Sequence, residues 1–365
     1  MLKLYDRKIP PKIILKTTGN ACNINCKYCF ELKKNVSNSI ISPETLEKLI
    51  HKISIPFPII FHGGETFLIN KNKFRELLSI VKRNYPHKIT SVKIQSNGTL
   101  LDSEWCEILF NEYKDLGIDI ALSLDGTKEM NSLRVDQNNL NTFDKVLNAY
   151  KLLEKYGKKS GMLSVISKNS LDFHNEYVDF ISSIPNLTFV KINALFNVDK
   201  NNLSEDSVTP TEFANFIIKV AEHYINNKLY NRLPIEPILS ILQKLKGKES
   251  RYCNYQKNKC YNYISVYPDG QIAPCDCFSA DEFTIAYLDK LDDDLEIAID
   301  QAIKKGNSLT LQNIVKNCEM CKIKNFCTGG CLSQRYYFSG NKELSDDFCA
   351  SKHRLYNYFS NLVIK

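Results

Sequence analysis

Short apolar runs rich in β-branched side chains alternate with longer segments of helical periodicity along residues 12–195. Short apolar runs bounded by turn residues predict strands, and apolar residues that recur at every third or fourth position predict amphipathic helices. The expected strands cover residues 12–18, 55–64, 91–98, 118–126, 161–167 and 187–195.

The helical segments begin and end at residues typical of helix termini. Ser42 can serve as an N-cap and Pro43 suits the first helical turn, while Gly117 and Gly157 can take the left-handed conformation that ends a helix. The expected helices cover residues 42–53, 71–84, 102–117, 141–157, 209–227 and 237–247.

Six repeats of strand and helix predict an α/β fold with a parallel sheet and right-handed crossovers. Because six units are too few for a closed eight-unit barrel, the sheet is either an open doubly wound sheet or a partial barrel. In both folds the ligand site lies at the carboxyl ends of the strands. The unusual sequences that follow the first four strands therefore mark the expected site.

The pattern changes near residue 253, where periodicity weakens and cysteines become frequent. A small region of this kind is held by bound ligands more than by an apolar core. The expected division is a barrel domain over residues 1–230, a helical linker over residues 231–252 and a small cysteine-rich domain over residues 253–365.

The formal net charge of +7 comes from lysines and arginines that are spread among acidic residues. Without a basic stripe, nucleic-acid binding is not expected. The chain lacks an apolar run long enough to span a bilayer, and its start lacks the apolar segment of a signal peptide, so we expect a cytoplasmic location and no membrane partner. In that reducing compartment the thirteen cysteines indicate metal ligands or redox groups.

Three cysteines follow the first expected strand, Cys22, Cys26 and Cys29, with three and then two residues between them. A structural zinc ion or a closed iron–sulfur cluster takes four ligands. Three thiolates can instead hold three irons of a four-iron cluster and leave the fourth open to a small molecule. The alternative is a zinc site completed by His51 or His62.

The stretch CNINCKYC resembles the signature of the radical S-adenosylmethionine (SAM) enzymes, which have an aromatic residue before the third cysteine. The resemblance implies a partial (β/α)6 barrel similar to a TIM barrel, with S-adenosylmethionine bound to the open iron of a [4Fe–4S] cluster. It also implies that an external reductant of flavodoxin or ferredoxin type supplies one electron. The 5′-deoxyadenosyl radical that is formed abstracts a hydrogen atom from the substrate.

Residues after the later strands match the positions at which this family contacts S-adenosylmethionine. Each one alone is more typical of a turn or a helix cap, but together they lie at successive strand ends. In a glycine-glycine-glutamate turn the missing β-carbons allow close approach of the ligand. The contacts implied by the resemblance are Gly63, Gly64, Glu65, Ser96, Asn97, Ser123, Asp125, Arg134 and Leu195.

Nine further cysteines lie from residue 253 onward, and eight of them, all but Cys277, are enough for two four-thiolate sites. Spacing alone leaves a zinc ribbon open, because short C-x2-C pairs suit zinc. The run from Cys260 to Cys349 resembles the SPASM domain of radical SAM enzymes that modify peptides and proteins, which implies two auxiliary [4Fe–4S] clusters and three clusters in all. The implied ligand sets are Cys253, Cys260, Cys275 and Cys331 for one cluster, and Cys318, Cys321, Cys327 and Cys349 for the other.

Two neighbours of the implied ligand Cys275 carry chemistry of their own. Asp276 stands where the related anaerobic sulfatase maturases have the proposed catalytic base, although it could merely accept a hydrogen bond in the cluster loop. Cys277 is expected to be a bystander, with a substitute ligand or a reactive thiol as the alternatives. The iron at Cys253 is left open to substrate in some relatives, and Cys106 is expected to be a buried apolar thiol.

The resemblance leaves two activities on a peptide or protein substrate. We expect an oxidoreductase that abstracts hydrogen from a ribosomally made peptide and so forms a thioether or carbon–carbon crosslink. The alternative is an anaerobic sulfatase maturase that converts cysteine or serine to formylglycine. A non-catalytic electron carrier or zinc scaffold would not need an open iron.

The segment before the first strand is too short for the winged-helix domain that many peptide maturases carry. If a leader peptide is read, we therefore expect a separate leader-binding protein, or the cleft between barrel and SPASM domain, to do so.

Overall fold

The computed structural model describes residues 2–363, in which a curved sheet of ten strands forms the centre of the molecule. The strand order is β12-β11-β10-β1-β2-β3-β4-β5-β6-β9, and β1 to β6 run parallel to one another. The strands are β1 Lys12–Lys16, β2 Phe57–His62, β3 Ile89–Ser96, β4 Asp119–Ser123, β5 Ser160–Ile166, β6 Leu187–Ala194, β9 Ile235–Glu236, β10 Tyr263–Val266, β11 Gln271–Ala273 and β12 Ala286–Tyr287. A separate two-stranded hairpin pairs β7 Val198–Asp199 with β8 Asn202–Leu203.

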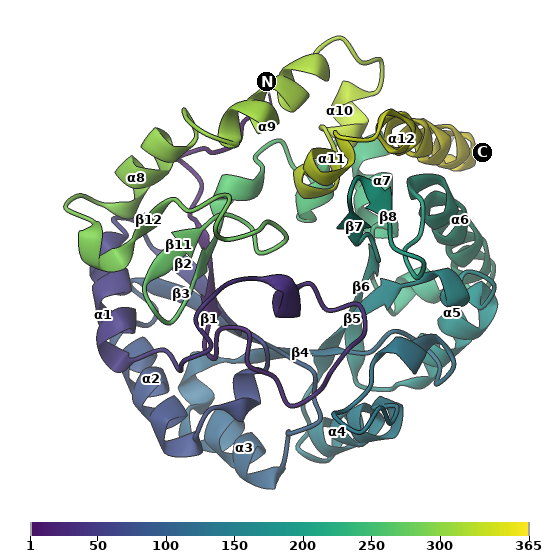
Figure 1. Cartoon of the computed structure of the whole chain (residues 1–365). Coiled ribbons are helices and arrows are strands. Elements are labelled where there is room, and N and C mark those ends of the chain that lie inside the picture. The colour runs from purple at the N-terminus through teal and green to yellow at the C-terminus, as the bar shows by residue number, and fades with distance from the viewer. Residues whose placement is uncertain (1, 364–365) are drawn as a thin grey trace.

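Helices cover the outer face of this sheet, as Figure 1 shows for α1 to α6. The expected N-cap at Ser42 is present, because its side chain accepts a hydrogen bond from the Thr45 amide. The helices are α1 Pro43–Lys52, α2 Lys71–Asn84, α3 Ser103–Glu107, α4 Phe143–Lys155, α5 His174–Ser183, α6 Pro210–Asn226, α7 Ile238–Leu245, α8 Leu295–Ala302, α9 Ser308–Asn317, α10 Lys324–Cys327, α11 Leu332–Phe338 and α12 Lys342–Val363.

These elements confirm the α/β fold with a partial barrel. Each of the six expected strands overlaps an observed strand, and adjacent parallel strands are joined through helices on the outer face. Figure 1 also shows the purple segment after β1 lying across the middle of the ring of strands. This segment contains the three-cysteine loop.

The helix expected over residues 102–117 is the clearest difference in local structure. It begins as α3 but widens into a π-helical turn over Ile108–Glu112 and ends in a 3-10 turn before Gly117, which is left-handed. Three consecutive apolar side chains, from Ile108 to Phe110, are all buried. A regular α-helix turns one of three successive residues away from its buried face, and the wider π turn relieves that conflict.

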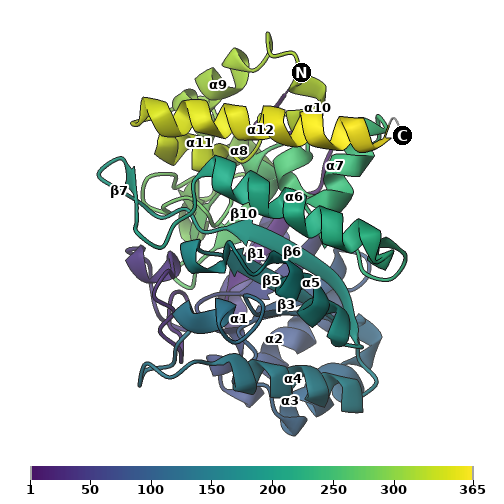
Figure 2. The same ribbon diagram turned by 90° about the vertical axis from the view of Figure 1, so that its right-hand side faces the viewer.

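The C-terminal region continues the barrel sheet. β10 pairs in parallel with β1, with Lys12 opposite Tyr263, and β11 and β12 extend the sheet further. Figure 2 shows α12 crossing the molecule beside α6 and α7. One cluster of buried apolar residues runs from Leu4 to Phe359, so the core is shared between the barrel and the cysteine-rich region.

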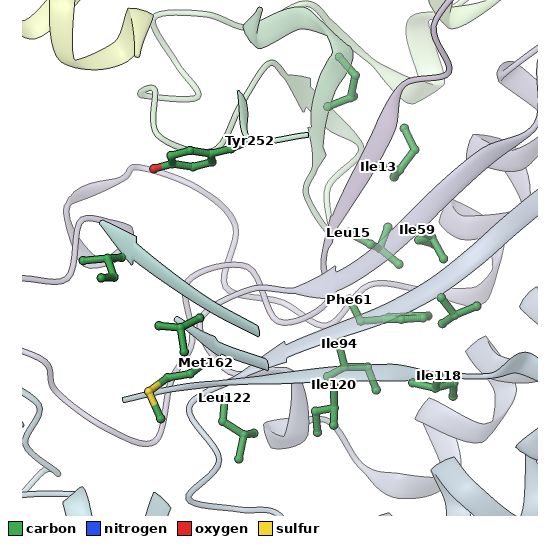
Figure 3. Packing of buried hydrophobic residues seen from close by; sticks show 14 of the residues in the cluster. Ile13, Leu15, Ile59, Phe61, Ile94, Ile118, Ile120, Leu122, Met162 and Tyr252 are labelled. Carbon is green, nitrogen blue, oxygen red and sulfur yellow. The ribbon is translucent and has the colours of Figure 1, made fainter. Parts of the chain in front are cut away.

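Alternate residues of the barrel strands fill this core. In β2 the even spacing of Phe57, Ile59 and Phe61 buries all three, and Figure 3 shows Ile59 and Phe61 beside Leu15 of β1 and Ile94 of β3. Period-two burial of this kind fixes which residues face the other side of each strand.

The helices formed by the described residues include none with the length and apolar character needed to cross a membrane.

Candidate active site

A cavity of about 590 Å³ opens at the carboxyl ends of the barrel strands. Its wall is shared between the three-cysteine loop, the ends of β2, β3, β4 and β6, and the loops that carry the C-terminal cysteines. The location is the one expected for a ligand site in a parallel α/β sheet.

Cys22, Cys26 and Cys29 all line this cavity. Two backbone hydrogen bonds hold this loop to the segment around Leu133 and Val135. The Asn25 amide donates to the Val135 carbonyl (2.7 Å), and the Lys27 amide donates to the Leu133 carbonyl (2.9 Å). The surroundings are apolar, and burial raises the pKa of the Cys22 thiol to about 12.

The thiols of this loop are too far apart for the zinc alternative. Ligands of one ion must all lie within reach of it, and among the described residues these cysteines form no such group with one another or with a histidine. His51 is exposed on α1. Three separated thiols at a cavity wall fit a multi-iron cluster better, since each thiolate binds a different iron.

The Gly63–Gly64 turn packs directly against the three-cysteine loop. The Gly64 amide donates to the Gly19 carbonyl (2.8 Å), and that of Glu65 to the Ala21 carbonyl (2.9 Å). A Cβ on Gly64 would lie 2.0 Å from the Ala21 oxygen. Only glycine allows this approach, which brings two of the expected contacts to the cavity wall.

Glu65 lies behind that wall and is fully buried. Its carboxylate accepts hydrogen bonds from Ser96 Oγ (2.7 Å) and from the amides of Asn97 (2.7 Å) and Phe67 (2.9 Å). The Asn97 side chain in turn reaches Cys22 Sγ at 3.5 Å. Glu65 thus joins the ends of β2 and β3 to the three-cysteine loop.

Arg134 presents an unsatisfied donor at the cavity. Its Nη1 donates to the Tyr28 hydroxyl (2.9 Å), which donates to Asp125 Oδ2 (2.7 Å). The buried Arg134 Nε has no hydrogen-bond partner among residues 2–363. A buried guanidinium nitrogen without an acceptor suits an anionic ligand group such as a carboxylate. Asp125 lies behind the wall, where its Oδ1 accepts from the Val165 amide (3.0 Å).

The remaining expected contacts also have defined places. Ser96, Asn97, Ser123 and Leu195 line the cavity, and Ser123 Oγ accepts a hydrogen bond from Gln95 (2.9 Å). The structure therefore gathers seven of the nine residues on one wall and sets Glu65 and Asp125 behind it. Their contacts with S-adenosylmethionine stay predictions.

The C-terminal cysteines lie in two places. Four of the eight implied ligands line the cavity, where Lys259 joins their loops by donating to the carbonyls of Cys253 (3.2 Å) and Gly330 (3.1 Å). Those four are Cys253, Cys260, Cys275 and Cys331.

The other four C-terminal cysteines are absent from the cavity lining. Cys318 Sγ accepts a hydrogen bond from Arg335 (2.7 Å), and Cys321 Sγ lies 3.9 Å from His353 Nε2. These four are Cys318, Cys321, Cys327 and Cys349.

A buried cluster of charges around Asp276 was missed by the sequence reasoning. Lys16 Nζ, fully buried at the end of β1, lies 2.6 Å from Glu31 Oε1 and 3.2 Å from Asp276 Oδ2. Lys34 Nζ lies 2.9 Å from Glu31 and 2.5 Å from the Asp276 carbonyl. Lys16 lies on the same face of the first strand as Lys12 and Ile14. This alternation was the indication in the sequence that the Lys16 side chain points into the barrel.

These ion pairs keep all four groups charged. Burial alone would raise the pKa of Asp276, but Lys16 and the other nearby cations hold it well below its usual range. Burial works against the charge of Lys16, but Glu31 and Asp276 outweigh it and raise its pKa. Asp276 is therefore an ionised carboxylate beside the three-cysteine loop.

His62 completes this side of the cavity. Burial and the nearby Lys16 ammonium lower the pKa of His62 to about 4, so the ring is neutral near pH 7. Its Nδ1 accepts from the Gly63 amide (2.8 Å), which leaves the proton on Nε2, 4.0 Å from Asp276 Oδ2. His62 thus offers a donor toward the cavity and the carboxylate.

Cys106, as expected, is fully buried in the core.

The family model of the Radical SAM superfamily matches residues 17–179, the segment that holds the three-cysteine loop and most of the barrel. Residues 17–179 are therefore a radical SAM domain. Its likeness to known proteins also extends beyond the matched segment.

Curated relatives of this radical SAM protein match over nearly its whole length. It is 26% identical to a cysteine-type anaerobic sulfatase-maturating enzyme of Clostridium perfringens, over 97% of this chain and 98% of the relative. It is 23% identical to a serine-type anaerobic sulfatase-maturating enzyme of Bacteroides thetaiotaomicron, over 97% of this chain and 90% of the relative.

Solved structures of related fold superpose on most of this chain. The structure of anSMEcpe with bound AdoMet superposes with a TM-score of 0.82 at 24% identity and covers 98% of both chains. The structure of Streptococcus suis SuiB bound to S-adenosylmethionine gives a TM-score of 0.59 at 17% identity and covers 88% of this chain and 73% of SuiB.

These comparisons correct the activity expected from the sequence. The expectation of thioether or carbon–carbon crosslinking in a ribosomally made peptide is wrong, because the curated relatives that match this radical SAM enzyme end to end are sulfatase-maturating enzymes. Asp276, at the position of the proposed catalytic base of the sulfatase maturases, was the residue that favoured this alternative.

Proposed function

We propose that this radical SAM enzyme is an anaerobic sulfatase maturase that oxidises a cysteine or serine side chain of a sulfatase to formylglycine. The observation that carries the proposal is the place of Asp276, an ionised carboxylate in the cavity wall that also contains Cys22, Cys26 and Cys29. Full-length similarity to cysteine-type and serine-type sulfatase-maturating enzymes supports the same reaction class.

The thiols and the unpaired guanidinium nitrogen favour the expected cofactors. Cys22, Cys26 and Cys29 would hold a [4Fe–4S] cluster, and Arg134 Nε would bind the carboxylate of S-adenosylmethionine. When bound, this pair supplies the reductive chemistry that removes a hydrogen atom from the substrate carbon. The protein's part is to bind the pair in an enclosed cavity with apolar walls, which limits access of water.

We also propose the two auxiliary [4Fe–4S] clusters and the division into barrel, linker and SPASM domain stated above. The four cavity-lining cysteines Cys253, Cys260, Cys275 and Cys331 would hold one cluster close to the substrate. The second set would hold its cluster outside the cavity. An external reductant would supply the one electron needed to cleave S-adenosylmethionine. Conversion of cysteine or serine to an aldehyde releases two electrons and two protons, of which one electron and one proton would leave as the abstracted hydrogen atom, and the cavity-facing auxiliary cluster would accept the second electron.

Asp276 would accept the proton of the substrate thiol or hydroxyl after the hydrogen atom has left the adjacent carbon. Its charge is maintained by Lys16 and Lys34, and the neutral His62 can donate a hydrogen bond toward it. A carboxylate of lowered pKa is a weak base, so the proton transfer depends on the substrate radical being far more acidic than its parent thiol. The substrate side chain must therefore reach Asp276 directly.

The proposal is tested with two peptides that carry the maturation segment of a sulfatase, one with cysteine and one with serine at the modified position. The reconstituted enzyme, S-adenosylmethionine and a strong reductant are incubated without oxygen, and mass spectrometry and aldehyde-specific labelling follow formylglycine. We expect an aldehyde from at least one peptide, together with 5′-deoxyadenosine. Cleavage of S-adenosylmethionine without aldehyde from either peptide would contradict the assignment.

A further inference from the structure

Five C-terminal thiols line the cavity, whereas the proposed auxiliary cluster needs four. Besides the four implied ligands, Cys277 also lies in the cavity wall, two residues after Cys275. All of them are free thiols. A four-iron cluster accepts one thiolate at each iron, so one of the five is in excess.

The position of the extra thiol is set by a tight turn. The Phe278 amide donates to the Cys275 carbonyl (3.0 Å), and the Cys275 amide donates to the Cys260 carbonyl (3.2 Å). The turn brings Cys275 Sγ, an Asp276 carboxylate oxygen and Cys277 Sγ within 4.8 Å of one another. Cys275 and Cys277 are thus anchored together beside Cys260.

This spacing is that of two ligands of one metal ion. A thiolate lies about 2.3 Å from its metal, so two sulfurs on one ion are at most about 4.6 Å apart. Thiolates on different corners of a four-iron cube point away from one another and lie farther apart. A separation below 4.8 Å therefore suits two thiols that compete for one iron better than two thiols that bind neighbouring irons.

The third member of the group is directed elsewhere. Asp276 Oδ2 pairs with Lys16 (3.2 Å), and the Asp276 carbonyl accepts from Lys34 (2.5 Å). Its Oδ1 accepts a hydrogen bond from Cys275 Sγ (3.9 Å), so both carboxylate oxygens already have partners within the protein. The two sulfurs are left as the competing ligands.

We propose that Cys277 is an alternative ligand to Cys275 at one iron of the cavity-facing auxiliary cluster. In the exchange, one iron–sulfur bond to Cys275 breaks as one to Cys277 forms, and the proton of the Cys277 thiol passes to Cys275. The oxidation state of the iron does not change. The inference rests on the auxiliary cluster of the proposed function and assigns a role to a thiol expected to be a bystander.

The test measures iron, sulfide and the Mössbauer spectrum in full-length protein whose first cluster has been removed by Cys22→Ala, Cys26→Ala and Cys29→Ala. This parent should hold two auxiliary clusters, about eight irons per chain. Cys275→Ala and Cys277→Ala are added singly and together. Cys331→Ala serves as the matched control, since Cys331 is an implied ligand of the same cluster but does not belong to the group formed by Cys275, Asp276 and Cys277.

We expect either single variant at residues 275 and 277 to retain about eight irons, and the double variant and Cys331→Ala to lose about four. Loss of four irons in Cys275→Ala alone, or full retention in the double variant, would overturn the exchange while leaving the auxiliary cluster in place. A parent without iron would reject the auxiliary clusters and the exchange with them. Formylglycine formation by the unmodified enzyme is measured separately and tests the proposed function independently.

Discussion

Lys16 Nζ lies 3.2 Å from Asp276 Oδ2 and so joins the first strand of the barrel to the loop that carries Cys275. The same ammonium lies 2.6 Å from Glu31, two residues after Cys29. A single buried cation therefore connects the two cysteine loops that face the cavity.

Lys16→Met should uncouple cleavage of S-adenosylmethionine from product formation. Without the ammonium, the Glu31 and Asp276 carboxylates are left partly unpaired in a buried site, which costs about 3 kcal/mol of unfolding free energy. We expect formylglycine per cleaved S-adenosylmethionine to fall at least about tenfold, since Asp276 loses the contact that orients it. Both quantities are measured on the reconstituted enzyme, by urea unfolding and by product analysis.

Lys12→Met is the matched control for that variant. Lys12 lies on the same face of β1, but its Nζ contacts the Tyr263 hydroxyl (2.9 Å) and no carboxylate. Lys12→Met should form as much formylglycine per cleaved S-adenosylmethionine as the unmodified enzyme. An equal loss of formylglycine per cleaved S-adenosylmethionine in both variants would mean that the structure of β1, and not the ion pair of Lys16, sustains product formation.

Asp276→Asn should keep cleavage of S-adenosylmethionine and lose turnover to product. The amide preserves the shape of the side chain but cannot take a proton, so we expect product formation to fall by about 10²–10⁴. Rates of 5′-deoxyadenosine and aldehyde formation are compared in the same reaction. Unchanged product yield would remove Asp276 from the mechanism.

Cys26→Ala should abolish both cleavage of S-adenosylmethionine and product formation. Loss of one of three thiolates leaves the first cluster without a stable attachment, and we expect about four fewer irons per chain. Cys106→Ala, which removes a fully buried thiol of the core outside the cavity, should keep its full iron content. Iron analysis distinguishes the two variants without reference to activity.

Gly64→Ala should weaken binding of S-adenosylmethionine more than it weakens the fold. The new Cβ would lie 2.0 Å from the Ala21 carbonyl oxygen, so the three-cysteine loop must shift. We expect affinity to fall at least about tenfold, since small displacements of a binding loop are costly. Gly161→Ala is the control, because its Cβ would meet nothing closer than the Ala121 side chain at 3.3 Å. Binding is measured by equilibrium dialysis of the reconstituted protein.

His62→Gln should flatten the dependence of stability on pH. The folded-state pKa of His62, about 4, lies below the value near 6.5 in the unfolded chain, so the unfolded state binds more protons between these values. The stability from His62 is complete above pH 6.5 and is lost as the pH falls toward 4. With the side chain a quarter exposed, we expect about 1–2 kcal/mol between pH 7.5 and pH 5.

Urea unfolding of the reconstituted protein at these two pH values checks the difference. The exposed His87 provides a control, and His87→Gln should leave the pH dependence unchanged. An unchanged slope in His62→Gln would show that His62 is not held neutral in the fold.

The barrel was predictable because its signals are local. Each strand from β1 to β6 is a short apolar run between turn residues. The three cysteines lie within eight positions, so their spacing indicates a cluster site without any distant residue. The three-cysteine loop also lines the cavity at the strand ends as expected, since parallel strands end at one edge of the sheet.

The charge cluster and the sheet extension could not be predicted, because they depend on distant partners. Lys16 meets Asp276 across 260 positions, and nothing in the run KIILKTT indicates which acid neutralises its lysine. The hydrogen bonds of Asp125 to Tyr28 and Val165 likewise join residues that are far apart in the sequence. Such side-chain directions follow from tertiary contacts and not from local pattern.

The pairing of β1 with β10 also governs how the chain is made. Lys12 and Tyr263 are 251 positions apart. During synthesis one edge of β1 therefore stays unpaired until the last third of the protein has left the ribosome. At cellular rates of translation this takes roughly 10–50 s, a period in which an open edge invites aggregation. Slower expression with chaperones present should therefore raise the yield of active protein.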